Sequence, residues 1–486
     1  MPQPGARLAA YATLALVLSL PVLVSDIPSG VDALNHFARI HIRAHIDADP
    51  DLAQLFTPRD ILIPYLGMDW LLTPLARVLP TLLVARIYEV GLAWGLTGAV
   101  MLLSRMVHGH LGYEAAATGL LAYNGLMAWG FINYMLGVIA ALLAFAAWYA
   151  WGNRPWLWRL GVFGSFCAGL YLVHLLALVA YAVMVGAYET CGRSWKDLPR
   201  RAAVILGQFL PPILLWLATA VPRPHGAPEI TYDWPNQIVA LASPFLFSGA
   251  LGGVDIGYVT LVLTGFLAVG FTRLGVLTWH RPLLATALAI MLLSVFLPVA
   301  VFGIFAINLR LPLVAACLAI AAVQLRPGAA LAQSAPLAVW IAILTVLQTG
   351  AVTREMARCG TDLTELRIAL DSLPRGTVLT PVLERSGATG QCPGFPFYEH
   401  AAQLITIERS GYASDFFGDN TSVRSRLYPA NLLARDASLV RPNTLSGTIL
   451  WLHLGQIRPA MQRLRPLHEG SFFSILTQEP GPTPSP

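Results

Sequence analysis

Four ionisable residues follow the first apolar segment of the chain at regular intervals. Asp32, His36, Arg39 and Arg43 occupy positions i, i+4, i+7 and i+11 of the stretch PSGVDALNHFARIHIRAH, residues 28–45. On an α-helix these four positions share one face. A carboxylate beside an imidazole and two guanidinium groups is suited to general-base chemistry on a substrate with an anionic leaving group.

The same spacing is also typical of an ordinary capped helix. Ser29 can cap the helix, and Asp32 stands three residues later, where a capping box and the helix dipole both favour a carboxylate. Asp32 and His36 would then form an i, i+4 pair on a solvated face. The sequence leaves open whether Asp32 is a base or a cap.

Further polar residues lie within or at the ends of apolar segments, where a charge costs roughly 3 kcal/mol on insertion scales. Arg86 and Glu89, at i and i+3, form either a self-neutralising pair or part of a site. Arg310 either grips a lipid phosphate or snorkels to the interface. His174 and Asn133 mark two outer segment ends, where each is either a packing residue or a substrate contact.

The sequence favours chemistry without a cofactor. Asp47 and Asp49 form a D-x-D pattern that could hold a divalent metal ion, but beside Pro50 the same residues are typical of a turn that ends a helix. A metal ion is therefore the disfavoured alternative. The chain has no P-loop, G-x-S-x-G, H-E-x-x-H or Rossmann glycine pattern, so soluble nucleotide-sugar chemistry and zinc proteolysis lack support.

Composition places these residues in a membrane protein. Of 486 residues, 56% are hydrophobic and 12% are charged, against roughly 25% charged residues in soluble domains. The net charge is +5 and Lys196 is the single lysine. The basic residues are thus almost all arginines, which match phosphate geometry, and we expect no nucleic-acid partner.

The pattern of apolar runs predicts eleven membrane spans. Each run is long enough to cross about 30 Å of hydrocarbon. The run at 156–190 is too long for one span and is divided near Gly169 into two. The other predicted spans are 8–25, 81–106, 111–128, 130–151, 200–221, 256–275, 281–303, 308–325 and 334–352.

Arginines predict the orientation of these spans. They gather in alternate loops, whereas the short loops near 125–130 and 304–308 carry none, which indicates a cytoplasmic N-terminus. Residues 1–352 then form a transmembrane module whose first extracytoplasmic loop is 26–80.

Residues 353–486 are predicted to form an extracytoplasmic α/β domain with a disordered tail. Strand-like runs occur at 376–382, 404–409 and 447–455. Cys359 and Cys392 could pair if this domain lies in an oxidising compartment.

This layout resembles the GT-C superfamily of integral membrane glycosyltransferases. The segments DALNHFAR at 32–39, YNGLMAWGFINYMLG at 123–137 and NLRLPL at 308–313 resemble bacterial membrane proteins of GT-C-like architecture, most of which have no assigned activity. The resemblance covers most of the chain in layout, although its motifs are short. Asp32 matches the acid of the family's first loop, but Ala33 follows it, so the paired acids of many members are missing.

The resemblance implies a mainly α, polytopic helical bundle of GT-C-like architecture with a small α/β domain at the C-terminus. It implies transfer of a sugar from a polyprenyl-phosphate carrier to a glycan or lipid acceptor at the outer face of a bacterial inner (plasma) membrane. The alternative is a lipid or glycan transporter, or a non-catalytic subunit of surface-polysaccharide assembly. For the enzyme we expect catalysis by Asp32 and His36, with substrate bound by Arg39, Arg86, Glu89, Asn133, His174 and Arg310.

Overall fold

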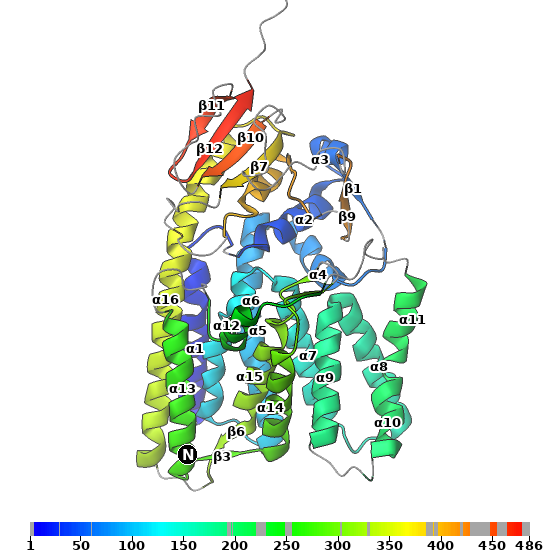
Figure 1. The fold of residues 1–486 in the computed structure, drawn as a ribbon, viewed down its shortest axis with the longest axis vertical. Helices are drawn as coiled ribbons and strands as arrows, with labels where there is room; N and C mark the ends of the chain where they lie inside the picture. Colours follow the sequence, from blue (N-terminus) through cyan, green and yellow to red (C-terminus); the bar gives the residue numbers. More distant parts are fainter. Residues whose placement is uncertain are drawn as a thin grey trace, which may run out of the picture.

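The protein consists of a helical bundle with a smaller region of strands and short helices at one end (Figure 1). This computed structural model confirms the predicted mainly α fold class. It describes residues 4–28, 30–59, 61–191, 196, 198–219, 230–247, 255–301, 304–327, 331–384, 392, 397–417, 421–427, 448–453 and 464–478.

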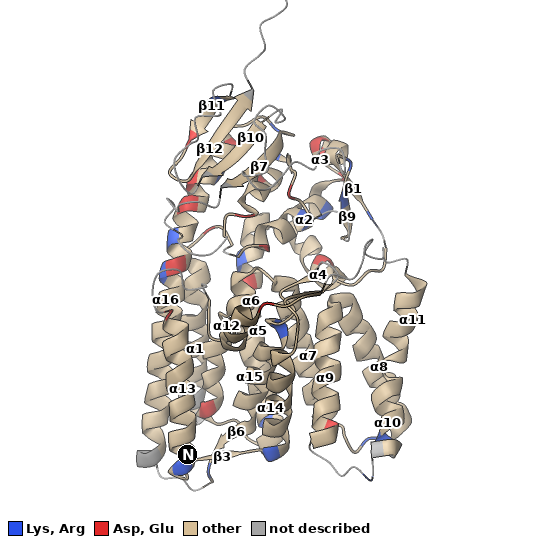
Figure 2. Cartoon of the chain, viewed as in Figure 1, with Lys and Arg blue, Asp and Glu red and all other residues tan. Residues whose placement is uncertain are grey.

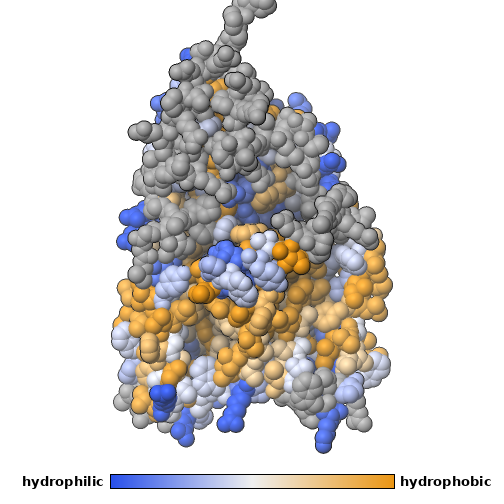
Figure 3. Space-filling view, in the orientation of Figure 1, coloured by the Kyte–Doolittle hydropathy of each residue, from blue (hydrophilic) through white to orange (hydrophobic). Residues whose placement is uncertain are grey.

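The bundle has the features of a multi-pass membrane protein. In the described ranges, six helices are long and apolar enough to cross a membrane, and four more apolar helices are shorter. On the face drawn in Figure 3, apolar residues form a broad band across the bundle, and in Figure 2 most of the charged residues lie toward its two ends. The helices of the bundle are α1 (Pro4–Leu23), α5 (Thr81–His108), α7 (Ile132–Ala150), α8 (Trp156–Val173), α9 (Leu175–Cys191), α10 (Leu198–Gly207), α11 (Leu210–Ala218), α13 (Ile256–Arg273), α14 (Arg281–Val295), α15 (Arg310–Ala322) and α16 (Leu331–Asp371).

The predicted division of 156–190 is present, but the break is at His174 and not near Gly169, which stays inside α8. The backbone of His174 is extended, with φ −167° and ψ 121°. Its Nδ1 accepts a hydrogen bond from the Leu176 amide at 3.2 Å, which satisfies a free donor at the start of α9. A capping side chain, rather than a flexible glycine, therefore makes this break.

Two other predicted spans are irregular. The segment 111–128 is a 3₁₀ helix, η1 (Tyr113–Leu121), followed by the short α6 (Gly125–Ala128), which Asn124 caps through its side chain. The segment 200–221 is divided into α10 and α11, because Pro211 lacks the amide that would continue the first helix.

The first loop forms a set of short elements above the bundle. They are α2 (Ala33–His45), α3 (Pro50–Leu55), β1 (Phe56–Pro58) and α4 (Leu66–Ala76). The predicted helix that carries the four ionisable residues is α2. A further small patch combines α12 (Trp234–Ala242) with strands β2 (Ile230–Thr231), β4 (Ala300–Val301) and β5 (Ile304–Phe305), and β3 (Leu277–Trp279) pairs with β6 (Val323–Leu325) at the opposite end.

The C-terminal region contains a five-stranded sheet in the order β11-β12-β10-β7-β8, in which β10, β7 and β8 are parallel. Helix α16 runs from the bundle into this region without interruption, across the predicted boundary at 352/353 (Figure 1). The elements of this region are β7 (Val378–Glu384), η3 (Ala401–Gln403), α17 (Leu404–Arg409), β8 (Tyr412–Ala413), β9 (Val423–Ser425), β10 (Thr448–His453), β11 (Leu464–Glu469) and β12 (Phe473–Gln478).

Two of the three predicted strands are confirmed, as β7 and β10, but the prediction of a strand at 404–409 is wrong. This segment is the helix α17, which buries Leu404 and Ile405 and ends at Ser410 with φ 53°. Its β-branched residues favour a strand, but η3 leads directly into a helical turn that packs both apolar side chains inward.

The first loop is attached to the C-terminal region by backbone and side chains. Strand β1 pairs antiparallel with β9. The Arg375 guanidinium contacts Asp49 at 2.6 Å and Asp51 at 3.1 Å. A turn at 46–48 follows the end of α2, as the turn interpretation of the D-x-D pattern predicts, and Asp49 caps the start of α3. Its carboxylate therefore already has a cationic partner.

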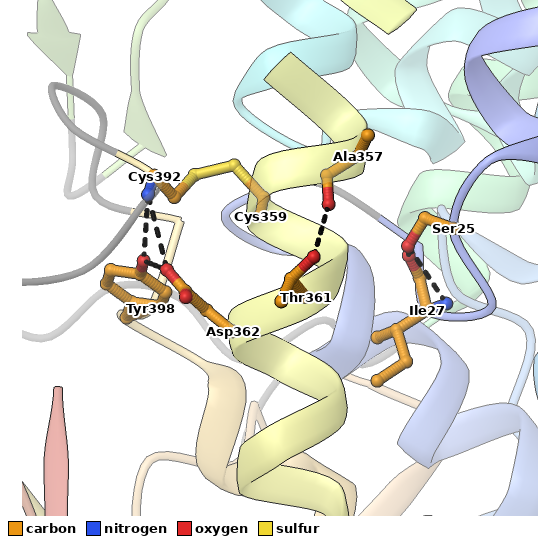
Figure 4. The surroundings of a disulfide bond; sticks show 8 residues. All are labelled: Ser25, Ile27, Ala357, Cys359, Thr361, Asp362, Cys392 and Tyr398. Carbon is orange, nitrogen blue, oxygen red and sulfur yellow. Dashed lines mark hydrogen bonds between the residues drawn. A yellow bond between two sulfur atoms is a disulfide. The ribbon is translucent and has the colours of Figure 1, made fainter. Parts of the chain in front are cut away.

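Cys359 of α16 and Cys392 form a disulfide, a pairing that the sequence left open (Figure 4). The adjacent Asp362 carboxylate accepts a hydrogen bond from the Cys392 amide at 3.2 Å and another from the Tyr398 hydroxyl. The disulfide and these hydrogen bonds fasten the C-terminal segment to the long helix.

Candidate functional site

Asp32 is the first residue of the site and stands at the N-cap position of α2. Its side chain makes no capping hydrogen bond. Instead, Oδ1 lies 3.4 Å from Nε2 of His400 in the C-terminal region, and the carboxylate keeps 20% of its surface exposed. The structure thus answers the question left open by the sequence, because the carboxylate faces the site and does not cap its helix. Ser29, the predicted cap, lies outside the described residues.

The residues that lie against the His400 ring are Asp32, Asp415, Asn35 and Phe417. Nδ1 lies 2.9 Å from Oδ2 of the buried Asp415, whose Oδ1 accepts a hydrogen bond from Gln403 at 2.7 Å. The Asn35 amide lies 3.0 Å from the same ring nitrogen and donates to the Asp415 carbonyl at 3.0 Å. The Phe417 ring packs edge-on against the imidazole with centroids 4.7 Å apart.

The two histidines near Asp32 carry different charges. Burial disfavours the charged form of His400, but its interactions with Asp32 and Asp415 outweigh burial and raise its pKa to about 9. Burial, followed by the nearby charges of Arg39 and His400, lowers the pKa of His36 well below its ordinary value. At neutral pH, His400 is therefore an imidazolium and His36 is a neutral imidazole.

His36 and Arg39 belong to a second buried network. The Arg39 Nε and one terminal nitrogen donate to Oδ1 of Asp69 at 3.0 and 2.9 Å, and its other terminal nitrogen donates to Nδ1 of His36 at 3.1 Å. Oδ2 of Asp69 accepts a hydrogen bond from Ser422. All three nitrogens of Arg39 thus have partners within the protein. His36, predicted to act in catalysis with Asp32, is bonded to Arg39.

Arg310 lies at the start of α15 with only 8% of its surface exposed. Its guanidinium lies over the rings of Phe131 and Tyr134, at 4.6 and 4.9 Å from their centroids. One terminal nitrogen donates to the Phe305 carbonyl at 3.3 Å. Among the described residues, Nε and the other terminal nitrogen have no hydrogen-bond partner. Arg310 is within electrostatic range of Asp32.

His174 occupies the break between α8 and α9, beside Arg310. Its ring packs between two tyrosines, with centroids 4.6 Å from Tyr65 and 5.2 Å from Tyr134. Tyr65 has a φ of 83°, which is unfavourable for a residue with a side chain. Asn133, adjacent to Tyr134 at the start of α7, is buried, and its side-chain oxygen has no hydrogen-bond partner within the described ranges.

Arg86 and Glu89 do not pair with each other in the described contacts. Arg86 contacts Asp26 at 2.9 Å, at an exposed position. Glu89 is buried, lies within electrostatic range of Tyr123, and has one carboxylate oxygen without a partner in the described part of the chain. Nothing among these contacts connects either residue to Asp32.

The structure brings together Asp32, His36, Arg39, His174 and Arg310. Each is within electrostatic range of at least one other member of this set. Four more residues lie at the site and were not predicted from the sequence: His400, Asp415, Asp69 and Tyr65. Asp69 lies in the apolar stretch LGMDWLLTPLA, where a lone acid is costly and could have been singled out. His400 and Asp415 carry no spacing signal.

Comparison with solved structures identifies the fold. A crystal structure of ArnT from Cupriavidus metallidurans bound to undecaprenyl phosphate is similar over 98% of this chain and 98% of its own, with a TM-score of 0.51 and 12% identity. The apo structure of the same protein matches over 97% and 98%, with a TM-score of 0.51 and 13% identity. No protein-family model and no curated protein sequence matches the chain. The chain has the fold of ArnT, a GT-C glycosyltransferase, which confirms the architecture predicted from the sequence.

Proposed function

We propose that the protein is a GT-C-type membrane glycosyltransferase that moves a sugar from a polyprenyl-phosphate carrier to a glycan or lipid acceptor. The observation that carries this proposal is the buried Arg310 guanidinium, which has two nitrogens without partners in the described residues and lies within electrostatic range of Asp32. A buried cation with open donors is suited to an anionic headgroup. The ArnT fold, seen elsewhere with undecaprenyl phosphate bound, supports the same carrier class.

In the proposed reaction, the acceptor hydroxyl transfers its proton to Asp32 as its oxygen attacks the anomeric carbon of the donor. The bond from that carbon to the carrier's phosphate oxygen breaks, and the phosphate leaves with an additional negative charge. Arg310 stabilises this charge in the transition state, where a fixed cation contributes most. Arg39 positions α2, because all three of its nitrogens already bond to Asp69 and His36 inside the protein.

The reaction would take place on the extracytoplasmic side of a bacterial inner membrane. The Cys359–Cys392 disulfide supports this placement of the C-terminal region, since disulfides persist in oxidising compartments. We assign no step to a metal ion, because the Asp49 carboxylate of the D-x-D pattern forms an ion pair with Arg375.

The donor site is tested by measuring undecaprenyl phosphate binding to the purified protein in detergent by native mass spectrometry. We expect Arg310→Gln to weaken binding by about 10- to 100-fold, the effect of losing a charge-assisted hydrogen bond. Arg86→Gln is the matched control, because Arg86 lies at the bundle surface beside Asp26. Equal affinity of Arg310→Gln and the unmodified protein would contradict the proposed site.

The catalytic role of Asp32 is tested in cells that lack the chromosomal gene. We expect a plasmid-borne Asp32→Asn variant to leave the surface glycans and lipid-linked sugars as altered as the deletion does, at an equal membrane level of protein. Normal glycans with Asp32→Asn would support the alternative of a transporter or a non-catalytic subunit.

A further inference from the structure

His400 connects the C-terminal region to the carboxylate at the centre of the site. Its Nε2 lies 3.4 Å from Oδ1 of Asp32, and its Nδ1 lies 2.9 Å from Oδ2 of Asp415. The imidazole is 3% exposed and the Asp415 side chain is 2% exposed. The imidazole ring therefore bridges two carboxylates away from bulk water. It has no role in the reaction proposed above.

The surroundings of this bridge hold it in one arrangement. Asn35 lies in α2, three residues after Asp32. It donates a hydrogen bond to the Asp415 carbonyl and accepts one from the Phe417 amide at 2.9 Å. Gln403 satisfies the second oxygen of Asp415 at 2.7 Å. Since Asp415 and Asn35 are themselves hydrogen-bonded, the imidazole has little freedom to turn away from Asp32.

We infer that His400 is a positioning residue for Asp32: as an imidazolium held by Asp415, it fixes the carboxylate that takes the acceptor's proton. This inference rests on the proposed function. His400 binds Oδ1, and Oδ2 has no hydrogen-bond partner in the described part of the chain, so Oδ2 is the oxygen that faces the acceptor. The proton moves from the acceptor hydroxyl to Oδ2, while His400 keeps both of its own protons.

The charge of His400 is what makes it effective. The titratable groups that face it are Asp32 and His36 from α2 and Asp415 from its own region. His36 is neutral, so a cation between two carboxylates gives this group a net charge of −1. If His400 lost its proton, the lone pair of Nε2 would face the Asp32 carboxylate and would repel it. Alkaline pH should therefore release Asp32.

The contact is tested without an activity assay by NMR of the full-length protein in detergent micelles, with labelled histidine. The resonance that disappears in His400→Gln should titrate near pH 9 in the unmodified protein. It should titrate at least about one pH unit lower in Asp415→Asn and in Asp32→Asn, since each removes a carboxylate. Titration at or below the ordinary value of about 6.5 in the unmodified protein would overturn the inference.

Arg375→Gln is the matched control for this titration. It breaks a different attachment of the first loop to the C-terminal region, through Asp49 and Asp51. We expect the His400 titration near pH 9 to survive in this variant. A shift as large as that in Asp415→Asn would mean that the titration reports general loosening of the two regions, and it would overturn the inference.

The functional consequence is tested in the deletion strain described above. We expect His400→Gln to reduce surface-glycan restoration by about tenfold or more at an equal membrane level, and the double variant with Asp32→Asn to be no worse than Asp32→Asn alone. If Asp32→Asn is inactive and His400→Gln is fully active, the inference fails and the proposed function stands. If Asp32→Asn is active, the proposed function itself fails.

Discussion

Arg39 and Arg310 are both buried at the same site, and both were predicted to bind substrate, but their surroundings differ. Arg39 has a carboxylate, an imidazole and a fixed geometry around all three of its nitrogens. Arg310 has two aromatic rings, one carbonyl and two nitrogens without partners among the described residues. A cation with a full set of protein partners positions the backbone that carries it, whereas a cation with open donors is arranged to receive an anion.

The largest effect on stability should follow loss of Arg39. Arg39→Gln leaves the Asp69 carboxylate buried, 2% exposed, without its cation. Breaking a buried ion pair in this way costs about 3–5 kcal/mol. Thermal unfolding in detergent should show a markedly lower midpoint.

The double variant Arg39→Gln, Asp69→Asn is the control for this result. It should recover much of the loss, because no charge is left unpaired in the interior. An unchanged unfolding midpoint for Arg39→Gln alone would show that the pair does not hold the site together.

The imidazolium of His400 is, like Arg39, a buried cation with protein partners, and its contribution should depend on pH. Its pKa is about 9 in the folded protein and about 6.5 in an unfolded chain. A raised pKa stabilises the fold fully below pH 6.5, and this contribution is lost as pH rises through 9. The difference corresponds to about 3 kcal/mol. Unfolding midpoints measured from pH 6 to pH 10 should fall across this window, and the fall should be much smaller in His400→Gln.

Arg310 should differ from Arg39 in the unfolding assay. Arg310→Gln removes two cation–π contacts, each worth about 1 kcal/mol, but it also removes a buried charge that has no carboxylate within ion-pair distance among the residues that the structure describes. We expect the unfolding midpoint to stay close to that of the unmodified protein, while undecaprenyl phosphate binding falls. A stability loss as large as that of Arg39→Gln would show that Arg310 is a structural residue, and the contrast between the two arginines would disappear.

The sequence predicted the parts of this site that depend on local pattern. The length of the apolar runs predicts the bundle, and the i, i+4, i+7 spacing of ionisable residues predicts α2. Arg310 and His174 are singled out because they lie at the outer ends of predicted spans. It could not decide whether Asp32 caps its helix, because the competing partner is remote. Asn35 and His400 are 365 positions apart and touch only in the folded chain. Contacts over such separations leave no periodic trace in one sequence.

The same limitation explains the arginines. Arg39 and Arg86 were predicted to bind substrate beside Arg310, because a sequence gives the charge of a side chain but not its partners. The partner of Arg39 is Asp69, thirty positions away and beyond α3 and β1, and the partner of Arg86 is Asp26, three residues after the end of α1. Only the fold distinguishes a satisfied guanidinium from an open one.

The smallest effect should follow loss of Arg86, the most exposed of the three arginines compared. Its partner Asp26 is 72% exposed, so water already screens the pair. Exposed ion pairs contribute about 0–1 kcal/mol. Arg86→Gln should therefore leave the unfolding midpoint, undecaprenyl phosphate binding and the His400 titration nearly unchanged. A loss of lipid binding equal to that of Arg310→Gln would show that an exposed, ion-paired guanidinium can bind the phosphate headgroup. Burial and unpaired nitrogens would then no longer distinguish the arginine that binds the phosphate.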